Sequence, residues 1–227
     1  MSGLRVISGS AKGRRLRAVP GSSTRPITDR AKESLFNIIG VDIKGATLLD
    51  LFAGTGSVGI EALSRGAGFT RFVEIERRAI ATIHANLKNT GLESGAEVLR
   101  IDAFHLLAGP VDRSFDYVYI APPQYQGLWK RALLNLDERM VWLSPDAWTI
   151  VQIHPREYEV LELQYLVEFD QRKYGSTLLS FFRQSEQPAN RQQEAENYQG
   201  DSDRQTDDGD TDDHPGDHQQ QTQDHSN

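Results

Sequence analysis

Short apolar runs alternate with segments of helical periodicity along the first part of the chain. Runs typical of buried strands occupy residues 47–52, 69–75, 96–101, 115–121 and 147–153. Apolar residues at helical spacing lie between them, at residues 57–65, 76–89 and 128–143. In the second of these helices the expected buried side consists of Ile80, Ile83, Ala85 and Leu87. Because strands alternate with helices, the pattern predicts an α/β fold with a mostly parallel, doubly wound sheet.

A basic segment precedes this core. Two short runs, residues 4–8 and 14–19, flank the glycine-bounded segment 9–13 and predict a hairpin. The next predicted element is a helix that carries on one face Ala31, Leu35 and Ile38. Its N-cap is expected to be Thr28 or Asp29, because either side chain can accept a hydrogen bond from the first helical turn.

Two further runs follow the core, at residues 158–169 and 177–183, and predict an antiparallel closing hairpin joined through Lys173-Tyr174-Gly175. From Ser185 onward apolar residues nearly vanish, and Asp, Gln, Asn and His dominate. Such a segment cannot bury enough apolar surface to offset chain entropy, so we expect it to be disordered. The expected organisation is a basic arm and helix at 1–40, a core at 41–184 and an acidic tail at 185–227.

Charge is distributed unevenly along the 227 residues. The formal net charge is −7, but residues 185–227 hold twelve Asp or Glu and two Arg and so carry −10. Residues 1–184 therefore hold 23 basic and 20 acidic side chains, a net of +3. The first 40 residues hold eight Lys or Arg against two acidic residues. The acidic total reflects the tail, so it does not exclude a nucleic-acid partner for the basic part.

The chain contains no cysteine. Disulfides, Cys-ligated metal sites and thiolate nucleophiles are therefore excluded. The N-terminus is basic without an apolar stretch after it, and no apolar run approaches the length of a membrane span. We expect a cytoplasmic, monomeric protein with no membrane or metal partner.

A glycine-rich loop follows the first predicted strand. The segment Asp50-Leu51-Phe52-Ala53-Gly54-Thr55-Gly56-Ser57-Val58-Gly59 satisfies the fingerprint G-x-G-x-x-G at the start of a helix. Glu74 closes the next strand, about 20 residues after Gly54, where an acid can accept hydrogen bonds from ribose hydroxyls. Three interpretations compete: a tight turn that needs glycine, a nicotinamide dinucleotide site, and a site for S-adenosylmethionine (SAM).

Asp50 favours the SAM interpretation. A dinucleotide brings pyrophosphate to the helix N-terminus, and a carboxylate in that turn would repel it. SAM carries a sulfonium and an ammonium instead, which a carboxylate at the end of a strand suits.

Other residues at the strand ends extend this cofactor site, each with a structural alternative. Asp102 could accept a bond from the adenine amine or cap the following helix, and Ile75 could pack on the adenine or belong to the core. Glu74 could equally be a surface acid. The predicted cofactor-binding residues are Asp50, Phe52, Ala53, Gly54, Gly56, Glu74, Ile75, Asp102 and Ala103.

The fourth predicted strand ends in two prolines, within Phe115-Asp116-Tyr117-Val118-Tyr119-Ile120-Ala121-Pro122-Pro123-Gln124-Tyr125. Proline cannot donate to the ladder of a sheet, so the strand stops there. The pattern predicts either a rigid loop or a fixed platform for a substrate at the carboxyl edge of the sheet, where ligands bind in such folds.

Together these segments resemble a known family. Amino-group methyltransferases of nucleic acids carry Asp, Asn or Ser, then Pro-Pro and an aromatic residue at this place. Residues 4–183 are similar to one branch, the bacterial small-subunit rRNA guanine-N2 methyltransferases of the RsmD family. The resemblance rests on Thr24-Arg25-Pro26, Thr28-Asp29-Arg30, Leu35-Phe36-Asn37, Asp50-Leu51-Phe52-Ala53-Gly54-Thr55-Gly56, Glu61-Ala62-Leu63-Ser64-Arg65-Gly66-Ala67, Phe72-Val73-Glu74 and Lys173-Tyr174-Gly175. It implies a Rossmann-like SAM-dependent methyltransferase fold with a reversed final hairpin, and a ribosomal substrate.

The sequence departs from the family pattern at the target amine. Ala121 stands where the family has its acid, and Gln124 stands where the aromatic residue is expected, with Tyr125 one place later. In the family, the acid accepts a hydrogen bond from the base amine and offsets the charge that develops on nitrogen. We hypothesise that Gln124 or a backbone carbonyl accepts that proton here, and that Tyr125 stacks on the flipped base. The predicted catalytic segment comprises Ala121, Pro122, Pro123, Gln124 and Tyr125.

The resemblance also suggests a role for the basic arm, which could otherwise be a solvated face. Residues expected to contact RNA phosphates are Lys12, Arg14, Arg15, Arg17, Arg25 and Arg30. The expected activity is methyl transfer from SAM to the exocyclic N2 amine of a guanine in small-subunit (16S) rRNA, either free or in an assembling small subunit. The absence of cysteine excludes the covalent route used on pyrimidine carbons. The alternative is a catalytically silent SAM- or RNA-binding protein of ribosome assembly, which Ala121 favours.

Overall fold

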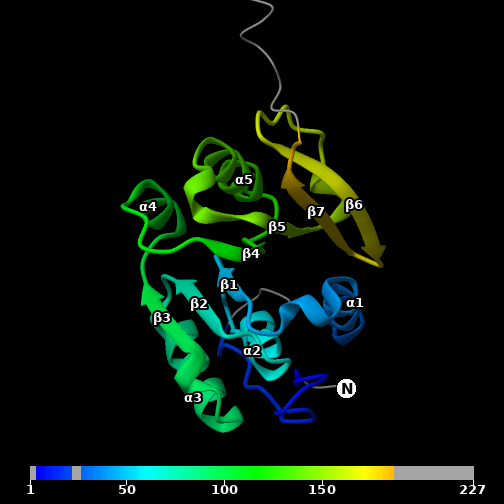
Figure 1. Ribbon diagram of the computed structural model, residues 1–227. Coiled ribbons are helices and arrows are strands. Elements are labelled where there is room, and N and C mark those ends of the chain that lie inside the picture. Colours follow the sequence, from blue (N-terminus) through cyan, green and yellow to red (C-terminus); the bar gives the residue numbers. More distant parts are fainter. Residues whose placement is uncertain (1–3, 22–26, 187–227) are drawn as a thin grey trace, which may run out of the picture. The chain divides into compact units, whose positions relative to one another are not determined.

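A computed structural model describes residues 4–21 and 27–186. The fold is built on a seven-stranded sheet in the order β3-β2-β1-β4-β5-β7-β6 (Figure 1). The strands are β1 (Thr47–Asp50), β2 (Phe69–Glu74), β3 (Ala96–Arg100), β4 (Phe115–Ile120), β5 (Leu143–Ile153), β6 (Leu166–Tyr174) and β7 (Thr177–Gln184). β1 to β5 pair in parallel, whereas β7 pairs antiparallel with β5 and with β6. The predicted parallel sheet and its reversed final hairpin are confirmed.

Helices cover both faces of the sheet (Figure 1). One face carries α1 (Asp29–Ile39), α2 (Ser57–Ser64) and α3 (Arg77–Thr90), and the other carries α4 (Ala103–Ala108) and α5 (Leu128–Glu138). Short 3-10 helices are η1 (Gly40–Ile43), η2 (Glu93–Gly95), η3 (Met140–Trp142) and η4 (Pro155–Glu157). Successive side chains of a strand point to opposite faces, so Leu48 and Leu49 of β1 belong to two separate apolar clusters.

The strand predicted at residues 158–169 is wrong in its first part. β6 begins only at Leu166 and continues to Tyr174, so the turn lies at Gly175 and Ser176. The buried carboxylate of Asp137, near the end of α5, accepts hydrogen bonds of 2.6–2.8 Å from the backbone N–H groups of Gln164, Tyr165 and Leu166. These bonds satisfy the backbone that a ladder would otherwise satisfy, so the chain joins the sheet late.

The helix predicted at residues 128–143 is shorter than expected, because α5 ends at Glu138. The guanidinium of Arg139 donates to the carbonyls of Leu107 and Gly109 at the end of α4, at 2.6 and 2.9 Å. The buried indole of Trp142 also donates to the Leu107 carbonyl, at 3.2 Å. These contacts hold the chain outside the helix, and β5 starts at Leu143.

The buried sides of α1 and α3 differ from the predicted ones. In α3 the buried residues are Ala79, Thr82, Ile83, Asn86 and Leu87, whereas Ile80 and Ala85 are only partly buried. In α1, Lys32 and Ile39 are buried and Ile38 is partly buried. The prediction counted apolar residues alone, but a polar side chain can occupy the buried face where it finds hydrogen-bond partners.

The N-terminal arm, residues 4–21, pairs with itself as an antiparallel hairpin but forms no regular strands. Arg5 and Arg15 make a single bridge, and hydrogen bonds of 2.9 and 2.8 Å run from Val6 N to the Arg14 carbonyl and from Leu16 N to the Leu4 carbonyl. α1 then begins at Asp29. Its N-cap is Thr28, whose hydroxyl accepts a hydrogen bond of 3.3 Å from Ala31 N.

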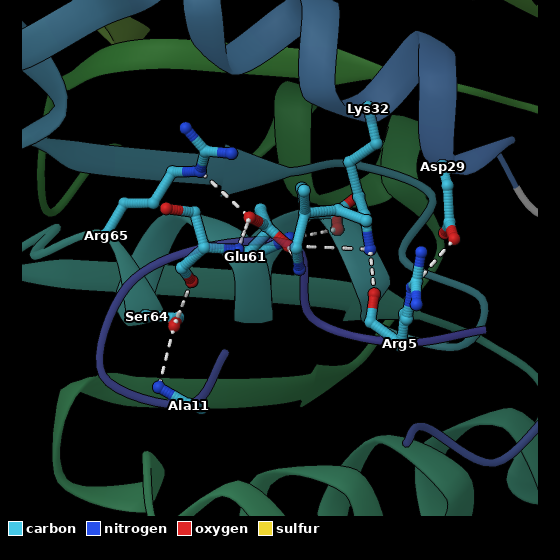
Figure 2. A network of polar contacts seen from close by, with 11 residues as sticks. Arg5, Ala11, Asp29, Lys32, Glu61, Ser64 and Arg65 are labelled. Carbon is cyan, nitrogen blue, oxygen red and sulfur yellow. Dashed lines mark hydrogen bonds and ion pairs between the residues drawn. The ribbon is translucent and has the colours of Figure 1, made fainter. Parts of the chain in front are cut away.

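A buried ionic network fixes the arm to α1 and α2 (Figure 2). The fully buried carboxylate of Glu61 accepts hydrogen bonds from Ile7 N at 2.7 Å and from Ser8 N at 2.9 Å. It also pairs with Arg65 at 2.8 Å and with Lys32 at 3.6 Å. Burial lowers the pKa of Lys32, and the negative charge of Glu61 opposes that change. The Glu61–Ala67 segment of the family pattern therefore has a structural role in holding the arm.

Some predictions fall on residues that the structure does not describe. Arg25 and residues 187–227, which make up nearly all of the predicted tail, lie outside the described ranges. Across residues 4–21 and 27–186, no helix is long and apolar enough to cross a membrane.

Candidate active site

The carboxyl ends of four parallel strands meet at one edge of the sheet. A hydrogen bond of 3.0 Å from Leu51 N to Tyr119 O joins the ends of β1 and β4. Another of 3.0 Å, from Ala53 N to Val73 O, joins β1 to β2. A third of 3.2 Å, from Ile101 N to Glu74 O, joins β3 to β2. The glycine loop, Glu74, Asp102 and the segment that starts at Ala121 therefore lie at this same edge. Sequence spacing placed each of them after a strand, and the sheet order brings them together.

The glycine loop makes the tight turn that its sequence predicts. Gly54 and Gly56 have φ values of 54° and 75°, in the left-handed region that favours glycine. A Cβ on Gly59 would lie 2.3 Å from the ring of Phe72, so only glycine lets α2 pack this close to β2. A Cβ on Gly54 would meet no atom within 4 Å, so the space beside the loop is open. The structural role of the glycines is confirmed, and the ligand role stays a prediction.

Asp50 lies beneath this loop and is 2% exposed. Its Oδ2 accepts a hydrogen bond of 3.3 Å from Gly59 N. Burial raises the pKa of the Asp50 carboxyl to about 7; the nearby charge of Glu74 adds to the rise, and the Gly59 bond opposes it. Water stabilises the charged form of a carboxyl, so its removal favours the neutral form. A cationic ligand group at this edge would shift the balance back toward the carboxylate.

Glu74 organises the backbone around the glycine loop. Its Oε2 accepts a hydrogen bond of 2.9 Å from Gly54 N, and its Oε1 accepts bonds of 2.8 and 2.9 Å from Ile75 N and Glu76 N. A carboxylate offers about four acceptor positions, so about one is left for a ribose hydroxyl in this arrangement. Glu74 is therefore more than a surface acid, because its hydrogen bond to Gly54 N connects the end of β2 to the glycine loop after β1.

The remaining predicted cofactor residues line the ends of β1, β2 and β3. Asp102 caps α4, its Oδ1 accepting from Phe104 N and His105 N at 2.9 and 3.0 Å, so the capping alternative is confirmed. Among the described residues no hydrogen bond engages its Oδ2, which leaves that oxygen for an adenine amine. Ile75 is 61% exposed, so its alternative as a core residue is wrong. Ala53 and Ala103 are buried, and half-buried Phe52 packs edge-to-face on Phe104.

The predicted catalytic segment forms the loop between β4 and α5. Ala121 is half-buried and packs against the apolar cluster on the α1–α3 face, and Pro122 is buried beside it. Pro123, Gln124 and Tyr125 are exposed. Among the described residues, the Gln124 side chain makes no hydrogen bond, so its amide oxygen is available to a substrate. Ala121 itself offers no side-chain acceptor.

Sequence analysis missed two residues that hold this loop. His154 and Glu157 follow β5, and the ring of His154 lies 5.7 Å from that of Tyr125. The Glu157 carboxylate accepts a hydrogen bond of 2.5 Å from Tyr125 N. The sequence contains a pattern that could have identified them. His154-Pro155-Arg156-Glu157 directly follows a predicted strand and forms a capping box at the same carboxyl edge.

The basic residues of the arm are exposed, as an RNA-contacting surface requires. These are Lys12, Arg14, Arg15 and Arg17, together with Arg30 on α1. The buried amide of Asn86 on α3 connects the arm to the glycine loop. It bonds to the backbone N–H and carbonyl of Arg17 at 2.7 and 3.1 Å, and to the Thr55 carbonyl at 2.9 Å. The arm and the candidate cofactor loop thus share one support.

Solved structures define the class of protein to which this fold and site belong. "Putative methyltransferase yhhF" from Escherichia coli superposes with a TM-score of 0.73 at 29% identity, over 82% of this chain and 100% of that one. An RNA methyltransferase from Salinibacter ruber, in complex with S-adenosyl-L-homocysteine, has a TM-score of 0.57 at 15% identity and shows the fold alone; it covers 73% of this chain and 97% of that one. The protein is a methyltransferase of the Rossmann-like α/β class.

Family membership follows from the sequence comparisons. Residues 4–183 match the family described as "Conserved hypothetical protein 95", and the chain belongs to that family. "Putative rRNA methyltransferase YlbH" of Bacillus subtilis is 43% identical over 183 residues, 79% of this chain and 98% of the relative. "Ribosomal RNA small subunit methyltransferase D" of Escherichia coli K12 is 35% identical over 150 residues, 66% and 74% of the two chains. These relatives favour the methyltransferase interpretation of the glycine loop over the nicotinamide one.

Proposed function

We propose that this protein transfers a methyl group from SAM to the exocyclic N2 amine of a guanine in small-subunit rRNA, acting as a monomer in the cytoplasm. The observation that carries the proposal is the single edge of the sheet at which the glycine loop, two strand-end acids and the Pro122–Pro123 loop meet. The named relatives act on ribosomal RNA. The exposed basic arm is suited to the phosphates of such a substrate.

The residues at this edge fit SAM. The space beside Gly54 is open, Glu74 can accept from a ribose hydroxyl, and Asp102 Oδ2 can accept from the adenine amine. The exposed Ile75 offers an apolar surface to the adenine ring. SAM supplies a methyl carbon bound to a sulfonium, which an amine nitrogen can attack in line.

The protein contributes position and hydrogen bonding to this chemistry. Tyr125 offers an exposed ring on which an unstacked guanine can lie, since enzymes that act on a base take it out of its stack. The Gln124 amide oxygen, or the carbonyl of Ala121 or Pro122, accepts a hydrogen bond from the amine and so offsets the positive charge that develops on nitrogen. The proton that the nitrogen then loses passes to water. Pro122 and Pro123 each have a fixed φ, which restricts the backbone that carries these acceptors.

The test is transfer of labelled methyl from SAM to small-subunit rRNA that lacks its own guanine-N2 methylation, with and without ribosomal proteins. The expected product is N2-methylguanosine. If the protein binds SAM but labels neither naked RNA nor any assembled particle, the catalytically silent assembly protein becomes the better interpretation. Ala121, which cannot accept a hydrogen bond through its side chain, is the observation that favours this second function.

Replacing Gln124 with alanine should lower kcat about 10- to 100-fold, because the amine loses the acceptor that offsets its developing charge. The KM for SAM should stay the same, since Gln124 is not among the predicted cofactor residues. Gln126→Ala, a change of a neighbouring exposed glutamine, is the matched control. Unchanged turnover of the Gln124 variant would assign the role of hydrogen-bond acceptor to a backbone carbonyl instead.

A further inference from the structure

Tyr125 has a backbone conformation that its residue type does not favour. Its φ is 62°, and it is the one non-glycine residue with positive φ in the part of the chain that the structure describes. A bulky side chain in this region crowds the adjacent backbone, so the conformation costs free energy and persists only where surrounding groups impose it. Such residues are concentrated at functional sites, where surrounding groups hold them in place.

The carboxylate of Glu157 provides that hold. Its Oε2 accepts the hydrogen bond of 2.5 Å from Tyr125 N, and its Oε1 accepts one of 3.2 Å from His154 N. One carboxylate therefore joins the loop after β4 to the loop after β5. His154 Nδ1 in turn accepts a bond of 3.2 Å from Arg156 N, which fixes the His154 ring beside Tyr125.

The consequence of this arrangement is a fixed, accessible aromatic ring. Tyr125 is 66% exposed although its backbone N–H is bound by Glu157 from the loop after β5. The rings of Tyr125 and His154 are 5.7 Å apart and inclined by 40°, so His154 supports the phenol ring from the side of β5. An exposed ring that is held in one direction loses little conformational freedom when a base stacks on it.

We propose that Glu157 is a positioning residue for methyl transfer, which holds Tyr125 in its left-handed conformation and so presents the ring to the target base. The inference rests on the function proposed above. The proposal also explains why the aromatic residue can stand at Tyr125 and not at position 124. A positive φ changes the direction in which a side chain leaves the backbone. Glu157 thus allows an aromatic residue one place after the family position to serve the same amine site.

Glu157→Ala should lower kcat for RNA methylation about tenfold, because small displacements of a bound group are costly for transfer. The KM for RNA should change little, since phosphate contacts supply most of the affinity for RNA. The dissociation constant of SAM should stay within about twofold, because Glu157 lies on the β4–β5 side of the edge. Glu157→Gln should lose less, because its one amide oxygen can still accept from one of the two N–H groups.

A double-mutant cycle separates positioning from general stability. Tyr125→Ala alone should lower kcat, and adding Glu157→Ala to it should cause no further loss. Fully additive losses would overturn the proposal, because Glu157 would then act independently of Tyr125. Glu159→Ala is the control: Glu159 is an exposed neighbour that pairs with Lys130 at 2.6 Å, and its removal should leave kcat unchanged.

Amide hydrogen exchange gives a readout that does not depend on activity. The Tyr125 amide should exchange faster in Glu157→Ala than in the wild type, and at the wild-type rate in Glu159→Ala. If the wild type transfers no methyl group to RNA, the proposed function fails, but the exchange rates still decide whether Glu157 holds Tyr125. An unchanged rate in Glu157→Ala and in Glu157→Gln would overturn the positioning role.

Discussion

Asp50→Asn should make the free protein more stable at pH 8 while weakening its binding of SAM. Asp50 is buried beneath the glycine loop, and burial raises the pKa of its carboxyl to about 7. At pH 8 the wild type therefore carries a buried negative charge, whereas asparagine is neutral and can still accept the hydrogen bond from Gly59 N. The difference between a carboxyl pKa of about 7 in the folded state and its ordinary value near 4 corresponds to roughly 4 kcal/mol as an upper limit. For a domain of this size, the unfolding midpoint should rise by several degrees.

The pH dependence follows from the direction of the pKa shift. The folded state keeps the Asp50 proton up to about pH 7, whereas the unfolded state releases it near pH 4. The folded state thus binds more protons between these values, so this group's contribution to stability falls as pH rises from about 4 to about 7. The difference between variant and wild type should be small at pH 4, grow through this window and level off above it.

The affinity for SAM should depend on pH in the opposite direction to the stability. A cationic group near Asp50 stabilises the carboxylate, so wild-type affinity should increase with pH up to about 7 and the variant should lack this dependence. Loss of one buried charge partner costs roughly 3 kcal/mol, or about 100-fold in the dissociation constant. Calorimetric titration and thermal unfolding at pH 5, 6, 7 and 8 measure both effects. Asp146→Asn, at an exposed acid, is the control. Parallel pH profiles for Asp50→Asn and the wild type would contradict the assignment.

The order of elements was predictable because apolar periodicity reports burial, and burial determines most of this fold. β1 to β5 each contain the greater part of a predicted strand. The central strands β1 and β4 are buried and leave near-continuous apolar runs, whereas β3 is a partly buried edge strand. The predicted element boundaries were wrong where hydrogen bonds of polar side chains determine where an element begins or ends. Asp137 delays the start of β6, and Arg139 ends α5, through hydrogen bonds to backbone groups that are distant in sequence. Local patterns carry no information on such partners.

Some residues of the candidate site were also predictable from the sequence pattern, and others were not. Strand-end acids and glycines were recognisable because the parallel sheet repeats one geometry, in which ligand-binding residues follow strands. Glu74 and Asp102 were assigned to a ligand, yet both also bind backbone N–H groups, which only coordinates reveal. The residues that hold Tyr125 were missed because Glu157 acts across two loops. The family pattern identified Ala121 as a departure, but gave no indication of what replaces the acid.

Glu61→Gln should be the most destabilising single change in the arm network, lowering the free energy of unfolding by about 3–5 kcal/mol. The Glu61 carboxylate accepts hydrogen bonds from Ile7 N, Ser8 N and the Arg65 guanidinium. It also lies 3.6 Å from the Lys32 ammonium. An amide has one acceptor oxygen and two donors, so it would leave buried N–H groups unpaired and Lys32 without its anion. Urea unfolding at pH 7 measures the loss.

Lys32→Met should cost clearly less, which distinguishes the two members of the pair. The Lys32 ammonium loses hydration on burial, and its partners are Glu61 and the Arg5 carbonyl at 2.7 Å. After its removal, Glu61 still has Arg65 and two backbone N–H donors, so the buried anion stays paired. Equal losses in the two single variants would contradict this asymmetry. The double variant should be more stable than Glu61→Gln alone, because no unpaired cation is left.

The same variants show whether the arm must be docked to bind RNA. Arg14 and Arg15 are exposed and lie outside the ionic network, so the double charge reversal Arg14→Glu/Arg15→Glu should weaken RNA binding without lowering stability. Its affinity should also depend less steeply on salt, because fewer phosphates are neutralised. Glu61→Gln should weaken RNA binding as well, at a temperature where the core is still folded, since the hairpin loses its anchor on α2. If Glu61→Gln binds RNA like the wild type while charge reversal does not, the arm contacts RNA without needing its buried anchor.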